Sequence, residues 1–285
     1  MKKITLLYAE SQPETLQLVP HLSKLLQHYG YESYLINITD KEQPILDSEL
    51  KASKMMIVLG GDGSILHAAH LEQAQGTPIL GINFGRVGYL TELEPDELEQ
   101  ELPYYLNGDK SIWIDERSML QATIANGEEQ QEFQALNDIM IARGTWPRGV
   151  YVRTWIDELF FDTFYGDGLI LSTATGSTAY NISVGGPILH PKIEGCILTP
   201  IAPHLASNRA VVIPLQSTIQ LQIATNSQDG VFSADGQWNC ELKDGAVVTI
   251  QKSPNITRFI RRKPRTHFYQ VIRGHQNDGE DKTLS

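Results

Sequence analysis

The chain has 285 residues, a length that favours two domains over one. Its 41% hydrophobic and 20% charged residues are typical of globular proteins and exclude the disordered and fibrous classes. The 23 Lys and Arg against 34 Asp and Glu give a formal net charge of -11, which argues against a dedicated nucleic-acid binder.

Cysteine and hydropathy patterns favour a cytoplasmic protein. The two cysteines, Cys196 and Cys240, are too few for a disulfide framework and lack the paired spacing of a zinc site. The first apolar run stops at Glu10, which is too short for a signal peptide. No stretch approaches the roughly 18 uninterrupted apolar residues of a membrane span, so we expect no membrane partner.

The first 110 residues or so alternate short apolar runs with longer amphipathic ones, which is typical of parallel strands connected by helices. Unbroken or nearly unbroken apolar runs predict strands over Ile4–Tyr8, Met55–Leu59 and Pro78–Ile82. Helical spacing predicts helices over Pro13–His28 and Ile65–Gln73. This half is predicted to be an α/β domain.

After Trp113 the pattern changes to short segments with period-two alternation, which predicts a β-rich domain. The expected strands are Met119–Ile124, Leu136–Ile141, Val150–Ile156, Ile219–Ile223 and Val247–Ile250. Asn126-Gly127 and Asp244-Gly245 are predicted hairpin turns.

The glycine-rich segment Gly60-Gly61-Asp62-Gly63-Ser64 lies between a predicted buried strand and a predicted helix. Such a turn lets backbone amides approach phosphate oxygens at the positive end of the helix dipole. It matches neither the dinucleotide fingerprint nor the common phosphate loop. A carboxylate here would repel phosphate directly, so Asp62 suits either a contact through a divalent cation or proton removal from a hydroxyl that attacks phosphorus. A helix-capping role for Asp62 is the structural alternative.

Two later segments carry further polar groups. An apolar run beginning at Gly166 leads into a dense set of hydroxyls and small residues from Ser172 to Asn181, which could offer amides and hydroxyls to phosphate or could cap a helix. Asn137 and Asp138 interrupt an otherwise apolar strand, so one should face inward or towards a ligand, unless the pair is a solvated strand end.

A basic cluster near the C-terminus contains Arg258, Arg261, Arg262, Lys263 and Arg265. We expect a solvated surface segment there, with contact to an anionic substrate or a neighbouring subunit as the alternative.

Taken in order, these segments resemble the NAD kinase family over most of the chain. The resemblance rests on six motifs: the Gly60–Gly63 turn, Gly81–Leu90, Asn137-Asp138, the run from Asp167 to His190, Leu198–His204 and Ser207-Asn208-Arg209. Each motif is weak alone, whereas the complete series is specific.

The resemblance implies an N-terminal α/β domain, a β-sandwich-like C-terminal domain and a nucleotide site between them. The corresponding ranges are 1–113 and 114–265, with 266–285 packing back onto the first domain. It also implies a homodimer or homotetramer.

The resemblance further assigns site residues. Asp62 is implied to be the base that activates the ribose 2'-hydroxyl of NAD, and Gly60, Gly61, Gly63 and Ser64 are implied to bind phosphate. The implied NAD-binding residues are Asp62, Gly63, His67, Asn137, Asp138, Tyr165, Asp167, Thr175, Thr178, Ala179, Tyr180, Asn181, Ile182, Ser183 and Gln237. No residue is assigned as a metal ligand.

The implied reaction transfers a phosphoryl group from ATP or polyphosphate to NAD, with a divalent cation such as Mg²⁺ neutralising phosphate charge. Four positions depart from the usual family pattern: Ser64 replaces threonine, Asp138 replaces glutamate, Ala174 replaces proline, and Tyr165 replaces a basic residue of some members. Two rival hypotheses are a lipid or sugar kinase with a similar turn and a non-catalytic NAD or NADP sensor.

Overall fold

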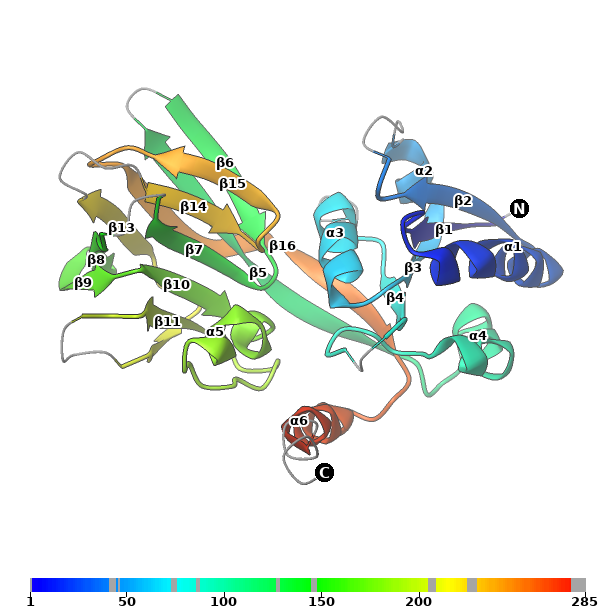
Figure 1. The fold of residues 1–285 in the computed structure, drawn as a ribbon. Helices are drawn as coiled ribbons and strands as arrows, with labels where there is room; N and C mark the ends of the chain where they lie inside the picture. Colours follow the sequence, from blue (N-terminus) through cyan, green and yellow to red (C-terminus); the bar gives the residue numbers. More distant parts are fainter. Residues whose placement is uncertain are drawn as a thin grey trace. The chain divides into compact units, whose positions relative to one another are not determined.

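The computed structural model describes residues 2–40, 45, 47–72, 76–85, 88–126, 129–144, 148–204, 209–224 and 230–277. The chain divides into two compact units (Figure 1). The first contains Met1–Glu116 and Thr257–Ser285, and the second contains Arg117–Ile256. The chain passes from one unit to the other within two long strands, β5 (Trp113–Asn126) and β16 (Val247–Arg261).

The first unit is built on a parallel sheet in the order β2-β1-β3-β4, with Phe259 of β16 paired beside β4. Its strands are β1 (Lys2–Tyr8), β2 (Tyr31–Asn37), β3 (Ser53–Leu59) and β4 (Ile79–Ile82). Its helices are α1 (Pro13–His28), α2 (Asp47–Ala52), α3 (Asp62–Glu72), η1 (Pro95–Glu97), α4 (Leu98–Asn107) and α6 (His267–Asn277).

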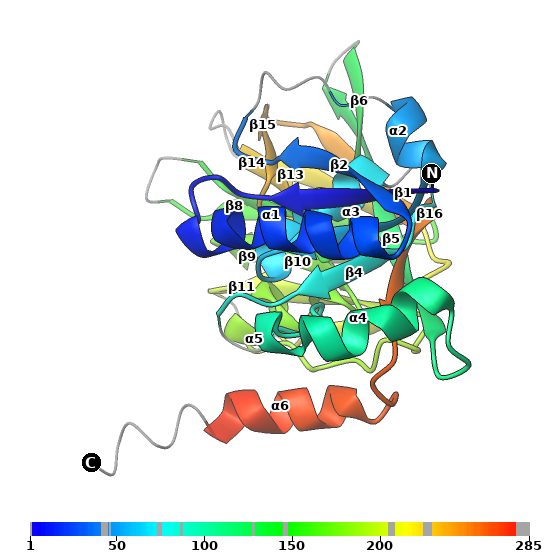
Figure 2. The same ribbon diagram turned by 90° about the vertical axis from the view of Figure 1, so that its right-hand side faces the viewer.

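Helices cover both faces of this sheet, as expected for an α/β unit. Leu22 of α1 and Leu102 of α4 are fully buried in one core with alternate residues of β1, β3 and β4. Figures 1 and 2 show α1 and α3 on opposite sides of the strands. Gly81 lets α3 approach β4 closely, because a Cβ there would lie 2.5 Å from Cδ1 of Ile65.

The predicted elements of this half are confirmed, with one correction at the start of α3. Helix α1 spans the predicted Pro13–His28, with Pro13 and Glu14 in its first turn. Helix α3 begins at Asp62, three residues before the predicted start. Asp62 therefore belongs to the first helical turn, where the helix dipole favours a negative charge. Gln73, the predicted last residue of this helix, lies outside the described residues.

The second unit consists of two antiparallel β-sheets that share one hydrophobic core. One has the order β12-β11-β10-β7-β14-β15, and the other contains β16, β13, β8 and β9 together with the β5–β6 pair. The remaining elements are β6 (Glu129–Ala135), β7 (Asp138–Arg143), β8 (Val150–Ile156), β9 (Leu159–Gly166), β10 (Gly168–Thr173), η2 (Gly176–Thr178), α5 (Tyr180–Ser183), β11 (Gly195–Ile201), β12 (Val211–Pro214), β13 (Ile219–Ala224), β14 (Gly230–Ala234) and β15 (Trp238–Leu242). The predicted β-sandwich-like fold is confirmed.

Two local predictions about the second unit need correction. Strand β7 begins at Asp138, so Asn137 lies in the bend before the strand and not inside it. Asp244 and Gly245 form a turn, with φ of +83° at Gly245, but the strands on either side belong to different sheets and make no hairpin. The predicted hairpin at Asn126-Gly127 does join an antiparallel pair, β5 and β6, although Gly127 lies outside the described residues.

Candidate active site

The glycine turn connects the buried end of β3 to the first turn of α3. Gly60 donates its N–H to the carbonyl of Ile82 at 3.0 Å. Its φ is +153°, and a Cβ at this position would lie 2.3 Å from Oγ of Ser64. The carbonyl of Gly61 accepts the first helical N–H groups, those of Ser64 and Ile65. The turn therefore presents the N-terminal end of a helix, where backbone N–H groups favour anions.

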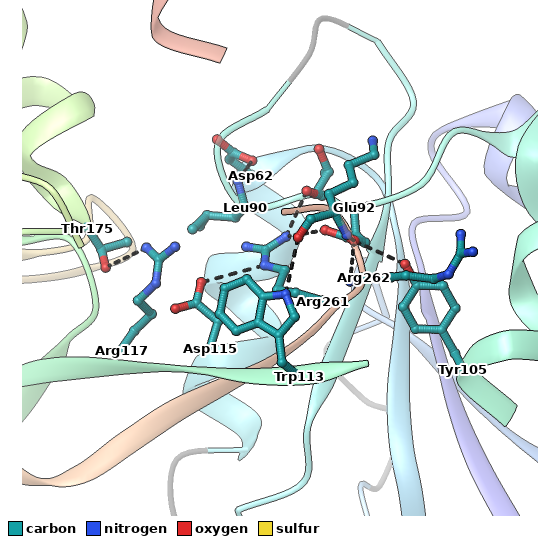
Figure 3. Close-up of polar contacts among 12 residues, drawn as sticks. Asp62, Leu90, Glu92, Tyr105, Trp113, Asp115, Arg117, Thr175, Arg261 and Arg262 are labelled. Atoms are coloured by element: carbon teal, nitrogen blue, oxygen red, sulfur yellow. Dashed lines mark hydrogen bonds and ion pairs between the residues drawn. The ribbon is translucent and has the colours of Figure 1, made fainter. Parts of the chain in front are cut away.

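Asp62 is half-buried at this helix end, and backbone amides hold both of its carboxylate oxygens. Tyr89 donates its N–H to Oδ2 at 2.9 Å, and Leu90 donates its N–H to Oδ1 at 3.0 Å. Figure 3 shows Leu90 beside the Asp62 carboxylate. The carboxylate thus has a fixed orientation and retains lone pairs that can accept a proton.

Asn137 and Asp138 are both buried in the second unit, which rules out the alternative of a solvated strand end. The Asp235 carboxylate accepts three consecutive backbone N–H groups, from Leu136 at 2.8 Å, Asn137 at 2.7 Å and Asp138 at 3.0 Å. Asp235 in turn donates its N–H to the carbonyl of Asp138 at 3.0 Å. The pair is therefore held rigidly at the start of β7.

Asp235 was not predicted from the sequence, although a signal was present. Asp235 and Gly236 have φ of +52° and +67°, and they form the turn between the paired strands β14 and β15. Asp-Gly between two short strands is a strong hairpin signal. It could have located the turn, but not the segment that the Asp235 carboxylate contacts.

Burial, followed by the charge of Asp235, raises the pKa of the Asp138 carboxyl to about 7 from an ordinary value of 3.8. Because the folded-state pKa is the higher one, the folded protein holds this proton more tightly than the unfolded chain. Protonation of Asp138 therefore stabilises the folded protein, by an amount on the order of 4 kcal/mol. This stabilisation is complete below about pH 4 and is lost as the pH rises to about 7.

We expect wild-type protein to lose more stability between pH 5 and pH 8 than the Asp138→Asn variant, which stays neutral at this position. Urea unfolding at the two pH values measures the difference. Asp244→Asn, at an exposed position of the same unit, should behave like wild type. Equal pH dependence in wild type and Asp138→Asn would contradict this assignment.

The hydroxyl-rich segment packs directly against the Asn137-Asp138 pair. Thr173 donates its N–H to the Asn137 carbonyl at 2.8 Å and its hydroxyl to the Leu136 carbonyl at 2.6 Å. A Cβ at Gly176 would lie 2.0 Å from the Asn137 carbonyl oxygen, so only glycine permits this approach. The structure thus brings two predicted NAD-binding segments together.

Other predicted residues of this segment have different environments. Buried Thr175 accepts a hydrogen bond from Nη1 of Arg117 at 3.2 Å (Figure 3), and half-buried Thr178 donates to the Thr175 carbonyl. Asn181 is fully buried and contacts the Ser177 and Pro187 carbonyls and the Thr199 hydroxyl. Ala179 is half-buried, whereas Tyr180, Ile182, Ser183 and Gln237 are exposed.

Tyr165 and Asp167 form a second group at the other end of β7 and β10. Asp167 pairs with Nε of Arg143 at 2.8 Å, and Arg143 ends β7 whereas Asp138 begins it. The Tyr165 ring stacks on Tyr151 at a centroid distance of 4.2 Å. Five strand intervals separate the two groups by about 17 Å.

His67 lies five residues after Asp62 in α3 and is half-buried. Burial, and to a smaller extent the charge of His70, lowers the pKa of His67. The imidazole is therefore biased towards its neutral form, which can both donate and accept hydrogen bonds.

The expectation that the basic cluster is a solvated segment is wrong for Arg258, Arg261 and Arg262, which pair with carboxylates of the first unit. Contact of this cluster with an anionic substrate or a neighbouring subunit stays a prediction. Arg261 pairs with Glu92 and Asp115, Arg262 with Glu101, and Arg258 with Glu116. The Arg265 guanidinium lies 4.4 Å from the centroid of the Trp113 ring. The acidic and aromatic partners of these cations come from distant positions in the sequence of the first unit.

Within the described residues, no three His, Cys, Asp or Glu side chains are grouped so as to hold a metal ion. Among the helices in the same part of the chain, none combines the length and apolar character needed to cross a bilayer.

Two family models match the chain. Residues 4–110 match the ATP-NAD kinase N-terminal domain, and residues 136–262 match the ATP-NAD kinase C-terminal domain. The glycine turn with its oriented carboxylate, in an α/β unit followed by a β-sandwich unit, thus defines a nucleotide kinase of two domains.

Relatives with similar sequences cover nearly the whole chain. The NAD kinase of Caldanaerobacter subterraneus is 35% identical over 280 residues, which are 96% of this chain and 98% of the relative. The NAD kinase of Moorella thermoacetica is 38% identical over 238 residues, which are 84% and 76% of the two chains. The chain therefore belongs to the NAD kinase family.

Solved structures show the same fold. An NAD kinase from Archaeoglobus fulgidus in complex with ATP has a TM-score of 0.76 and 27% identity, covering 95% of this chain and 98% of that one. Yeast NADH kinase complexed with NADH has a TM-score of 0.85 at 21% identity, covering 96% and 86%, and is similar in fold alone.

Proposed function

We propose that this protein transfers the γ-phosphoryl group of ATP to the 2'-hydroxyl of the adenosine ribose of NAD, giving NADP and ADP. The hydroxyl oxygen forms a bond to the γ-phosphorus, and the bond from that phosphorus to the β–γ bridging oxygen breaks. The hydroxyl proton passes to the carboxylate of Asp62. The electron pair of the broken bond leaves with ADP.

The observation that carries this proposal is the oriented carboxylate of Asp62 at the N-terminal end of α3. A carboxylate held by the N–H groups of Tyr89 and Leu90 is fixed in position yet can still accept a proton. The N-terminal end of α3, where the helix dipole favours anions such as phosphate, lies in the same turn. One short segment thus supplies both the place for the phosphate and the base.

We assign NAD binding chiefly to the second unit. The rigid Asn137-Asp138 pair and the adjoining Thr175 and Thr178 offer amide, carboxyl and hydroxyl groups to a ribose. Exposed Tyr180 offers a ring face for a base or a nicotinamide. Asn181 supports this segment from within, because its amide is engaged by protein groups.

Magnesium enters with ATP as part of the substrate. Its oxygen ligands in such complexes come mainly from phosphates and water, with one or two carboxylates from the protein.

Purified protein incubated with NAD, ATP and Mg²⁺ should form NADP, which an NADP-specific dehydrogenase detects in a coupled assay. Polyphosphate and NADH in place of ATP and NAD define the donor and acceptor preferences. Absence of NADP with every donor would refute the proposed activity and favour a nucleotide sensor.

We further propose a cytoplasmic location, which suits the free thiols of Cys196 and Cys240.

We also propose that the protein forms a homo-oligomer through β9. Strand β9 ends its sheet, and Leu159, Phe160 and Phe161 are exposed there by 75%, 53% and 42%. An apolar edge strand is a ready site for pairing with a second copy.

Sedimentation equilibrium should therefore give a mass at least twice 31.9 kDa, and Phe160→Lys should lower it towards the monomer value. Ile193→Lys, at another exposed apolar position, serves as the control. A monomeric wild-type protein would contradict the oligomer.

A further inference from the structure

The orientation of the Asp62 carboxylate depends on a turn that lies far along the chain. The N–H groups of Tyr89 and Leu90 hold its two oxygens separately. Two bonds to different oxygens restrict both the rotation of the carboxylate and its distance from the turn. The direction of its remaining lone pairs therefore follows the position of the Gly88–Leu90 backbone.

Gly88 allows this backbone to reach the carboxylate. A Cβ at residue 88 would lie 2.3 Å from Oδ1 of Asp62 and 3.0 Å from its Cγ. The first distance is shorter than real Cβ contacts, so any side chain here must displace either the carboxylate or the turn.

The residue after this turn is fixed by Arg261, the last residue of β16. Arg261 donates from Nη1 to the Thr91 carbonyl at 2.8 Å and pairs through the same nitrogen with Glu92 at 3.3 Å. Its Nε lies 3.6 Å from Oδ2 of Asp115. The side chains of Arg261 and Glu92 are only 8% and 2% exposed.

Glu92 connects the turn to the backbone after β16. Its Oε1 accepts the N–H of Arg262 at 2.8 Å, the N–H of Lys263 at 2.9 Å and the hydroxyl of Tyr105 at 3.0 Å (Figure 3). Burial, with a smaller contribution from the charge of Glu92, raises the pKa of Tyr105 well above its usual range, so this hydroxyl stays protonated and donates.

Buried ion pairs often contribute little net stability, because desolvation offsets their attraction. A group of charges that must all be satisfied does, however, select one arrangement of the backbone around it. Here the selected arrangement is that of the Thr91-Glu92 backbone, directly after the residues that hold Asp62.

We propose that Gly88 and Arg261 are positioning residues for phosphoryl transfer. The Gly88–Thr91 turn, anchored by Arg261, holds the Asp62 carboxylate in the orientation that accepts the hydroxyl proton. This inference rests on the proposed role of Asp62 as the base.

Gly88→Ala should lower kcat by roughly 10- to 100-fold, because a displacement of the base by about 1 Å is enough for losses of that size. KM for NAD and ATP should change by no more than about two-fold, since the interactions that bind the ground state and the transition state equally are retained. Gly274→Ala is the matched control, because a Cβ there meets no atom within 4 Å.

A double-mutant cycle separates positioning from general structural damage. In an Asp62→Asn background, Gly88→Ala should lower kcat no further than about two-fold, because the base it positions is already absent. Losses that multiply in the double variant would overturn the proposal.

Arg261→Lys provides a second, independent variant that keeps the positive charge but has one nitrogen in place of the separate Nη1 and Nε donors of the planar guanidinium. This variant should fold and show a lowered kcat with little change in KM. In the Asp62→Asn background, it should cause little further loss of kcat, as Gly88→Ala does. Wild-type kcat in both Gly88→Ala and Arg261→Lys would refute positioning while leaving the activity intact. Full activity in Asp62→Asn would instead refute the base assignment, and the positioning proposal with it.

Discussion

Asp62→Asn should lower kcat by about 10²- to 10⁴-fold, the range contributed by a positioned general base. Asparagine keeps the size of the side chain and one acceptor oxygen, but it cannot take the proton of the attacking hydroxyl. The dissociation constant for NAD should stay within a few-fold of wild type, because the assigned NAD-binding groups lie mainly on the second unit.

Coupled NADP formation measures kcat, and calorimetric titration with NAD measures binding. Asp96→Asn, an exposed substitution in the same unit, controls for loss of an acidic charge. Turnover close to that of wild type in Asp62→Asn would show that another group, or the substrate itself, accepts the proton.

Arg261→Met should lower the free energy of unfolding by about 3–5 kcal/mol, the usual cost of removing one partner from a buried ion pair. Methionine fills a similar space, but it leaves the Glu92 and Asp115 carboxylates without their cation and the Thr91 carbonyl without its donor. Urea unfolding followed by circular dichroism gives the difference from wild type.

Arg258→Met is a matched control, because it makes the same substitution three residues earlier in the same strand. Arg258 pairs with Glu116, but these side chains are 35% and 58% exposed, so the expected loss is at most about 1 kcal/mol. If both variants lost the same free energy of unfolding, burial would not determine how much these ion pairs contribute to stability.

Local sequence signals predicted the fold well where one element carries its own evidence. Pro13 and the spacing of apolar residues fixed the bounds of α1, and the uninterrupted run Met55–Leu59 identified β3. Asp62 was placed in the turn before α3 because an Asp-Gly pair suits turns, whereas the helix dipole also accommodates it inside the first turn.

The partners of the site residues could not be predicted, because they are distant in sequence. Asp235 lies 97 residues from Asp138, and Arg261 lies 169 residues from Glu92. A run of cations such as Arg258–Arg265 appears solvated when only its neighbours along the chain are considered. The carboxylates that neutralise it become visible only after folding brings them into contact.

The position of Arg261 near the C-terminus also bears on how the protein is made. The first unit needs Thr257–Ser285 as well as Met1–Glu116, so the ribosome must add about 145 residues before the cation for Glu92 exists. At about 5–20 residues per second, this takes roughly 7 to 30 s. During that interval the nascent N-terminal segment carries an unmatched acidic group that must remain hydrated. We therefore expect the Arg117–Ile256 unit, whose sequence is continuous, to complete its fold on the ribosome first.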